Sequence, residues 1–265
     1  MNPINLLEVS GASVGALAVV HSVTFAIGRR IGRYNVVDVA WGVGFVAIAA
    51  VAATLGHGEA SRRWLLLALV AIWGLRLSWH IQRKTAGKGE DPRYAALLRE
   101  ATLSQVIRKV FVLQAFITWF VSFPLQLSAV SGPTPTPLTA VAVLGVAVWL
   151  VGVTFEAVGD WQLKAFKSDP AHRGVVMDRG LWAWTRHPNY FGDAAVWWGL
   201  WLITITGWVS LATIGSPLLM TYFLVYVTGA RLTEKLMAGR PGFDEYRQRT
   251  AFFFPRPPRS ANNWR

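Results

Sequence analysis

The sequence predicts an all-α integral membrane protein with seven transmembrane helices, its N-terminus outside and its C-terminus inside. Hydrophobic residues make up 53% of the chain and charged residues 15%, and the mean hydropathy is +0.37. A soluble domain carries about a quarter charged residues. Several apolar stretches approach the roughly 20 residues that a helix needs to cross a bilayer. We therefore treat residues 1–265 as one integral membrane domain.

The expected spans follow one another along the chain with polar loops between most of them. The first could be read as a signal peptide, but it lacks a basic leading segment and a small-residue cleavage site, so we expect a retained helix. The last two are joined by almost nothing, which leaves their boundary open. The seven spans are 11–28, 36–56, 64–82, 108–130, 138–159, 190–207 and 209–230.

The cationic residues set the expected orientation. Of the 26 Lys and Arg, all but Arg62, Arg63 and Arg76 lie in alternate loops or in the C-terminal segment. By the positive-inside rule these loops are cytoplasmic. The net charge of +12 is thus concentrated on one face, where it favours anionic membrane lipid. We expect no nucleic-acid partner, because no basic domain stands outside the membrane. The absence of Cys excludes disulfides and thiolate chemistry.

Ionisable residues inside spans are costly and mark functional or internally paired positions. Eight of them lie in the half of a span nearest the inner face, which predicts a polar cavity that opens inward. Snorkelling, capping or pairing of an Arg with a carboxylate is the alternative for each one alone. The eight are Asp38, Arg76, His80, Glu156, Asp160, Asp193, Arg231 and Glu234.

Residue spacing adds detail to this cavity. Glu156 and Asp160 are four positions apart and share one helix face, as do Asn189 and Asp193 at the start of the sixth span. The N-terminal end of a helix offers free N–H groups and a positive dipole end, which suit an anion or an amide. Pro188 fits the first helical turn, where its missing N–H costs nothing.

Motifs of soluble enzymes do not account for the chain. The segment GVGFVA (42–47) has dinucleotide-binding spacing, but that fingerprint requires a preceding strand and a βαβ unit. Gly42 and Gly44 are better explained by close helix packing. The five His are scattered, so we expect no metal site.

Several segments resemble the steroid 5-alpha-reductase family. NYFGD (189–193) followed by Trp197 resembles that family's Asn-Phe-Leu-Gly-Glu block, and GLW (180–182), Tyr246 and FFFP (252–255) match its flanking features. More closely, the chain resembles a bacterial branch of that superfamily, DUF1295, through DVAWGVGF, LRLSWHIQR, DPRY and TRHPNYFGD. The resemblance covers nearly the full chain and is strongest over 178–255, which it makes the C-terminal cofactor-binding part.

The resemblance implies an NADPH-dependent reductase that acts on a C=C bond of a lipophilic substrate, a steroid-like enone or an unsaturated lipid. It places the protein in the bacterial inner membrane with its active site towards the cytoplasm, and leaves the oligomeric state open. Asp38 matches the family's catalytic acid, while His80 stands where the family has a tyrosine. An imidazole can donate to a carbonyl oxygen and transfer protons near neutral pH. Trp41 and Trp197 would wall the substrate pocket.

The resemblance also implies a cofactor-binding set spread over several helices. Asn189 and Asp193 would hold the nicotinamide amide, and Arg and Lys would meet the phosphates. The full set is Arg83, Arg93, Glu156, Asp160, Lys164, Arg186, His187, Asn189, Tyr190, Asp193, Arg231, Glu234 and Tyr246.

Two alternatives stand beside the reductase. RHPNY (186–190) also resembles the Arg-His-Pro-x-Tyr block of isoprenylcysteine carboxyl methyltransferases, which use S-adenosylmethionine and a downstream Glu, here Glu234. Asp160 and the Asn189–Asp193 pair favour the reductase. A non-enzymatic transporter or lipid-binding protein is the third class, and the gathering of polar groups at one face argues against it.

Overall fold

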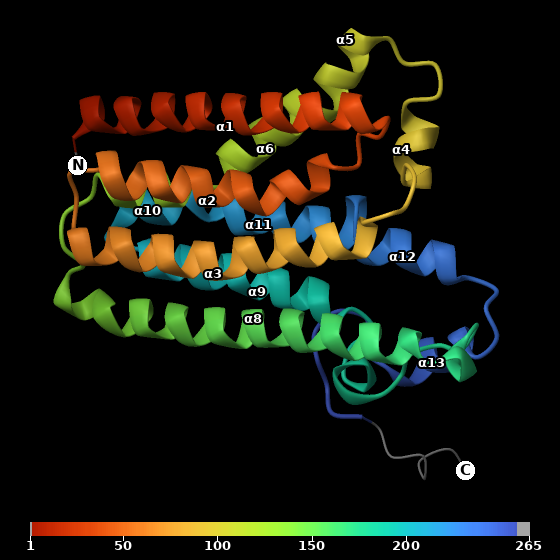
Figure 1. Ribbon diagram of the computed structural model, residues 1–265. Helices are drawn as coiled ribbons and strands as arrows, with labels where there is room; N and C mark the ends of the chain where they lie inside the picture. The colour runs from red at the N-terminus through yellow and green to blue at the C-terminus, as the bar shows by residue number, and fades with distance from the viewer. Residues whose placement is uncertain (1, 259–265) are drawn as a thin grey trace. The chain divides into compact units, whose positions relative to one another are not determined.

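The computed structural model describes residues 2–258, and every regular element in that range is helical (Figure 1). The chain divides into two compact units, one formed by residues 2–142 and 203–216 and the other by residues 143–202 and those from 217 onward. Unit 1 contains α1 (Pro3–Ile31), α2 (Val37–Leu55), α3 (Ala60–Thr85), α4 (Pro92–Leu97), α5 (Leu103–Val106), the π-helix η1 (Ile107–Val112), α6 (Leu113–Val121), α7 (Phe123–Ala129), the 3₁₀ turn η2 (Thr136–Leu138), α10 (Trp208–Leu211) and the 3₁₀ turn η5 (Ala212–Ile214).

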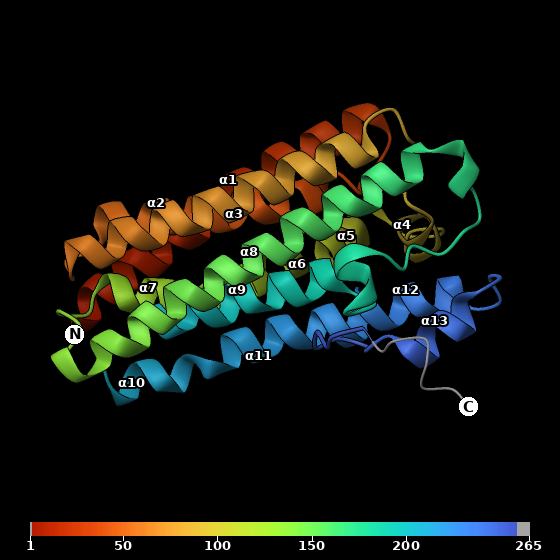
Figure 2. The same cartoon turned by 90° about the horizontal axis from the view of Figure 1, so that it is seen from below.

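Unit 2 carries the elements that hold the C-terminal motifs. Two helices, α8 and α9, run side by side in it (Figure 2). Its elements are α8 (Thr139–Ser168, which begins in unit 1), the 3₁₀ turns η3 (Pro170–His172) and η4 (Gly180–Ala183), α9 (Pro188–Thr204), α11 (Gly215–Tyr222), the π-helix η6 (Phe223–Val227), α12 (Ala230–Met237) and α13 (Phe243–Arg249).

Among residues 2–258, six helical segments are long and apolar enough to cross a membrane, which confirms the prediction of a polytopic α-helical membrane protein. Three of these segments consist of two or more consecutive elements. The sixth expected span, 190–207, corresponds to α9, which has 17 residues and is not among the six. The six segments are Pro3–Ile31, Val37–Leu55, Ala60–Thr85, Leu103–Val121, Thr136–Ser168 and Trp208–Met237.

Helix α1 is longer at both ends than hydropathy predicts. The Asn2 side chain accepts hydrogen bonds from the N–H groups of Ile4 and Asn5, and Pro3 occupies the first turn. Gly32 ends the helix with a φ of 72°, the left-handed conformation that favours glycine. These caps extend the helix beyond its apolar stretch.

Helices α1, α2 and α3 lie side by side in unit 1 (Figure 1), and α2 and α3 approach each other through glycines. A Cβ atom at Gly42 would overlap the carbonyl oxygen of Gly74. Next to this crossing, the Ser78 hydroxyl donates 2.7 Å to the carbonyl of Val39. The GVGFVA segment is therefore a helix-packing surface, as the sequence predicts.

Helices α8 and α9 approach each other through glycines spaced seven residues apart. Gly145, Gly152 and Gly159 lie on α8, while Gly192 and Gly199 lie on α9. A Cβ at Gly192 would be 2.5 Å from the Glu156 nitrogen, and one at Gly199 would be 2.6 Å from the Gly145 oxygen. Small residues let two membrane helices reach backbone contact. This contact places the polar start of α9 beside Glu156 and Asp160.

Candidate functional site

A carboxylate and a phenol from distant segments meet at the start of α2. Asp38 lies in the first turn of α2, and Tyr94 of α4 donates a 2.6 Å hydrogen bond to it. The Arg93 guanidinium is 3.9 Å from the second Asp38 oxygen. Arg93 pairs more closely with Asp91, to which it donates two bonds of 3.0 Å. We call Asp38, Asp91, Arg93 and Tyr94 the α2 cluster.

The loop before α4 is fastened to the start of α2 by hydrogen bonds to main-chain groups. The Glu90 carboxylate accepts from the N–H groups of Tyr34 and Asn35, at 2.5 and 3.0 Å. Arg33 donates to the carbonyls of Thr85 and Lys88, at 2.8 and 2.6 Å. The α2 cluster is therefore held by docking of residues 85–94 against residues 33–38.

This environment fixes the protonation of two groups outside the spans. Burial, followed by the charge of Asp38, raises the pKa of the Tyr94 phenol far above its usual value of about 10. Tyr94 is thus a neutral hydrogen-bond donor throughout the physiological range. The hydrogen bond from the Arg93 side chain lowers the pKa of Asp91, which keeps that carboxylate ionised at neutral pH.

His80 belongs to a different face of α3 from the one that packs against Gly42 of α2. Asp38 shares a face of α2 with Gly42, four residues on, and that face contacts Gly74 and Ser78. A helix turns about 100° per residue, so His80 lies more than about 100° around α3 from this contact. Its half-buried side chain shares the stripe of Trp73 and Arg76.

The other predicted residues of α2 and α3 take part in aromatic contacts. Trp41 is half-buried, and its ring meets that of Phe45 edge-on at 5.1 Å. Arg83 is exposed and lies 5.2 Å over the ring of Trp79.

The start of α9 forms a second polar site, within unit 2. The Asn189 amide donates a 3.3 Å hydrogen bond to the Asp160 carboxylate. Glu156, Asp160 and Asp193 are all buried, with exposed fractions of 2%, 8% and 7%. Close glycine packing of α8 and α9 brings these three acids and the amide together. Lys164, one turn beyond Asp160 on the same face of α8, is exposed.

Next to this group, Glu234 of α12 joins Arg186 and His187. Arg186 donates 2.6 Å to the Glu234 carboxylate, and the His187 ring nitrogen Nε2 lies 3.2 Å from the same oxygen. His187 also stacks on Tyr190 with ring centroids 5.8 Å apart. We call Glu156, Asp160, Arg186, His187, Asn189, Asp193 and Glu234 the α9 cluster.

With this geometry established, comparison with known proteins identifies the family. The profile of DUF1295, described as a protein of unknown function, matches residues 24–250. The chain belongs to the DUF1295 family. It is also similar to an uncharacterized protein of Schizosaccharomyces pombe, 25% identical over 237 residues, which covers 76% of this chain and 66% of the relative. The chain thus spans slightly less than two thirds of that relative's length. No solved structure matches it.

In this DUF1295 member, several predicted cofactor residues hold the chain's own C-terminal segment. Besides Glu234, Arg186 donates to the main-chain carbonyls of Arg247 and Thr250, at 2.8 and 2.7 Å. The buried phenol of Tyr246 donates 2.6 Å to the carbonyl of Trp182, and burial raises its pKa. These contacts give Arg186 and Tyr246 a structural role.

The remaining predicted residues of unit 2 occupy varied surroundings. Arg231 is exposed and lies 4.9 Å over the Tyr226 ring and 5.8 Å over the Phe252 ring. Trp197, by contrast, is 1% exposed and belongs to the packed interior. Within residues 2–258, no group of three His, Cys, Asp or Glu side chains is arranged to hold a metal ion.

Sequence reasoning on this DUF1295 chain did not assign roles to Tyr94 and Thr185. Tyr94 lies in the DPRY landmark, in which Asp91 caps α4 and Pro92 begins it. The buried Thr185 hydroxyl donates to the carbonyl of Phe253 at 2.9 Å, and Arg186 N–H donates to Ala251 at 2.9 Å. The Phe-Phe-Phe-Pro run is thereby tied to the segment that leads into α9.

Proposed function

We propose that the protein is an NADPH-dependent membrane reductase that adds hydrogen across a C=C bond of a lipophilic substrate, a steroid-like enone or an unsaturated lipid. The observation that carries the proposal is the Asn189–Asp160 hydrogen bond at the start of α9, beside the buried acids Glu156 and Asp193. A nicotinamide carboxamide has two N–H donors and one carbonyl acceptor. The carboxylates could accept from its N–H groups, and the Asn189 amide could donate to its carbonyl.

The stripe along α8 supports the same cofactor. Glu156, Asp160 and Lys164 are spaced four residues apart and share one helix face. Buried acids at one end of this stripe and an exposed lysine at the other suit a ligand with a carboxamide end and a phosphate-bearing end. Arg231, which is also exposed, would add a second positive charge for the phosphates.

The proposal assigns the proton-donating role to Tyr94 and His80. A bound NADPH would supply the hydride that forms the new C–H bond at the β-carbon, and a proton completes the reduction at the α-carbon. Tyr94, a neutral phenol that donates its single O–H to Asp38 in this structure, would turn that O–H to an enone oxygen when substrate binds. His80 is proposed to transfer the proton.

We further propose that α9 is a seventh crossing, so that the N-terminus is outside and the C-terminus inside a bacterial inner membrane. Seventeen residues span about 26 Å at 1.5 Å per residue. That is slightly short of a hydrocarbon core of about 30 Å, a mismatch that local thinning and flanking residues accommodate. The active site would then face the cytoplasm.

A second function has one observation in its favour. The α9 cluster is rich in carboxylates, whereas the Arg186 guanidinium is engaged with Glu234 and two main-chain carbonyls. Acids suit the sulfonium and ammonium charges of S-adenosylmethionine better than they suit phosphates. The alternative is therefore an S-adenosylmethionine-dependent membrane methyltransferase.

Measuring cofactor binding to the purified protein distinguishes the reductase from the methyltransferase. Titration of wild-type protein in detergent with NADPH, followed by energy transfer from the protein's 14 Trp, should give saturable binding, and S-adenosylmethionine should not compete. Asn189→Leu should weaken NADPH binding about tenfold or more, because it removes the amide that is proposed to bind the carboxamide and that donates to the Asp160 carboxylate. The matched control Asp244→Asn, in the exposed part of α13, should bind as wild type.

The opposite pattern would decide against the reductase. Binding of S-adenosylmethionine without NADPH would support the methyltransferase. Binding of neither cofactor would reject both enzymes in favour of a non-enzymatic lipid-binding protein or transporter. NADPH binding that Asn189→Leu and Asp193→Ala leave undiminished would remove the α9 cluster from the site.

A further inference from the structure

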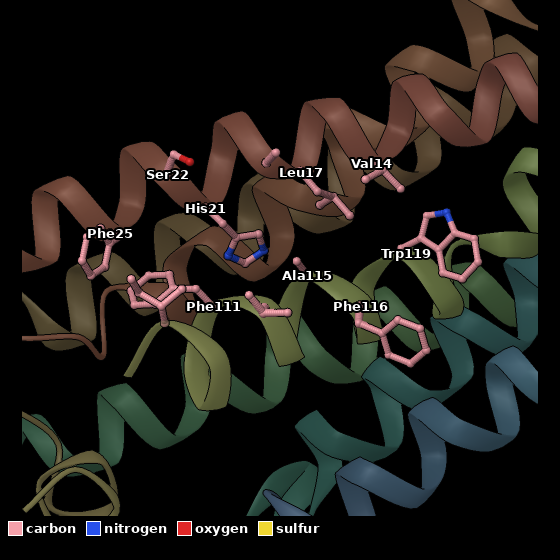
Figure 3. A pocket seen from close by; sticks show the side chains of 12 residues that line it. Val14, Leu17, His21, Ser22, Phe25, Phe111, Ala115, Phe116 and Trp119 are labelled. Atoms are coloured by element: carbon pink, nitrogen blue, oxygen red, sulfur yellow. The ribbon is translucent and has the colours of Figure 1, made fainter. Parts of the chain in front are cut away.

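Unit 1 contains an apolar cavity that the proposed reaction does not use. It has a volume of about 600 Å³ and is formed by residues 14–25 of α1 together with residues 107–119 of η1 and α6 (Figure 3). This volume falls within the range typical of small-molecule sites, about 300–1,000 Å³. Three of its lining side chains, Val14, Val112 and Phe116, are more than half exposed. The cavity is thus a recess open at the surface.

One buried polar side chain points into this recess. His21 is 6% exposed, and neither of its ring nitrogens has a hydrogen-bond partner among the described residues. Its ring extends from α1 towards the segment that carries Phe111 and Ala115 (Figure 3), and it meets the Phe111 ring edge-on at 6.4 Å. A buried polar group without a partner costs free energy, so a ligand that supplies one would bind favourably.

The lining defines the chemistry of that ligand. Apart from His21, the lining includes no ionisable side chain. Its other polar groups are the Ser22 hydroxyl and the Trp119 indole N–H, which donates to Ser10. A charged headgroup would have no counter-charge here, and its burial would be unfavourable. A hydroxyl both donates and accepts, so it can pair with either ring nitrogen whichever tautomer is present.

We propose that this recess binds a neutral lipid alcohol, with its hydroxyl on His21 and its hydrocarbon between α1 and the η1–α6 segment. Both walls belong to predicted membrane spans, so such a molecule would reach the recess from the hydrocarbon phase. The site does not depend on the proposed NADPH chemistry, and none of its residues belongs to the α2 or α9 cluster.

The test compares two photoreactive probes that differ in one group, a diazirine-bearing hexadecanol and the matching hexadecane. Wild-type protein in nanodiscs should be labelled about 3- to 10-fold more by the alcohol, the ratio expected for one hydrogen bond. The adducts should map to residues 14–25 and 107–119. His21→Leu should reduce the ratio to about one, while His57→Leu, outside the recess, should preserve it.

Filling the recess gives an independent outcome. Ala115→Trp should abolish saturable labelling by both probes, and Ala18→Trp, at an exposed position of α1, serves if the first variant elutes as an aggregate. Equal labelling of wild type by the two probes, adducts outside the two segments, or a preference that survives His21→Leu would each overturn the proposal. NADPH binding should stay unchanged in all these variants.

Discussion

The Tyr94 phenol donates a 2.6 Å hydrogen bond to the carboxylate of Asp38, 56 positions earlier in the chain. This bond joins the loop helix α4 to the first turn of α2. Asp38 therefore has a phenolic partner within unit 1. By the family resemblance, the catalytic tyrosine of the steroid 5-alpha-reductase family corresponds instead to His80. Docking of the loop before α4 therefore determines the chemistry available at Asp38.

Replacement of Tyr94 by Phe should destabilise this docking. The loss of one hydrogen bond to a carboxylate should lower the free energy of unfolding by about 1.5–3 kcal/mol, measured by thermal unfolding in detergent. Tyr222→Phe, at an exposed position, is the control and should have little effect. A double-mutant cycle with Asp38→Asn that shows no coupling would contradict the assigned pair.

The Asp91–Arg93 pair should make the α4 loop sensitive to acid. Because Arg93 lowers the folded-state pKa of Asp91, the pair stabilises the loop above the unfolded pKa of about 3.9. That contribution is lost as the pH falls through the lower folded value. The protection of residues 85–98 against hydrogen exchange, relative to the intrinsic amide rate at each pH, should fall below about pH 4.

Asp91→Asn should remove this acid response, because the amide does not titrate. Protection in the variant should be lower than in wild type at neutral pH and should change little on acidification. An unchanged acid response in Asp91→Asn would assign the effect to another carboxylate.

The glycine-mediated contact between α8 and α9 should not accommodate even one added methyl group. Gly192→Ala places a Cβ against the backbone of Glu156, and overpacking of this kind costs about 1–3 kcal/mol. Nucleotide binding should fall as well, because the Asn189–Asp160 pair depends on the same contact. Gly15→Ala in α1, where nothing lies within 4 Å of the added atom, should be neutral or stabilising. Equal effects of the two substitutions would refute the close approach.

Arg186→Lys should release the C-terminal segment. The Arg186 guanidinium donates hydrogen bonds to Glu234 and to two main-chain carbonyls. A lysine ammonium lacks the planar arrangement of N–H donors that makes these three bonds. Limited proteolysis should cut residues 247–254 several-fold faster than in wild type. The exposed Arg247→Lys serves as the control, and equal cleavage rates in the two variants would leave Arg186 without this role.

The sequence predicted the regular part of the fold well, because long apolar stretches are helical in a membrane. The expected span 36–56 is α2, Val37–Leu55. The span 11–28 was too short because Asn5 is polar. Its side chain donates to the Leu55 carbonyl and accepts from His57 N–H, which lets a polar turn continue the helix. Such satisfaction by distant groups cannot be read from hydropathy.

The candidate site was predictable where neighbours are close in sequence. The spacing of Glu156, Asp160, Asn189 and Asp193 predicted shared helix faces, and the structure brings Asn189 to Asp160. The expected partnership of Asp38 and His80 rested on the family resemblance and remains a prediction. Contact between two helices depends on rotation about each axis, which the Gly42–Gly74 approach determines here.

The π-helical segment η1 has a consequence of a different kind. A π-turn contains one more residue than an α-turn of the same chain, and such turns arise by insertion into a regular helix. Ile107, Phe111 and Val112 all border the lipid-alcohol recess, and in a plain α-helix the residues beyond this turn would be rotated by about 100°. The shape of the recess therefore depends on one extra residue within η1. A family member that lacks this residue should show a one-residue gap between positions 107 and 112 in an alignment, and we expect it to lack the recess.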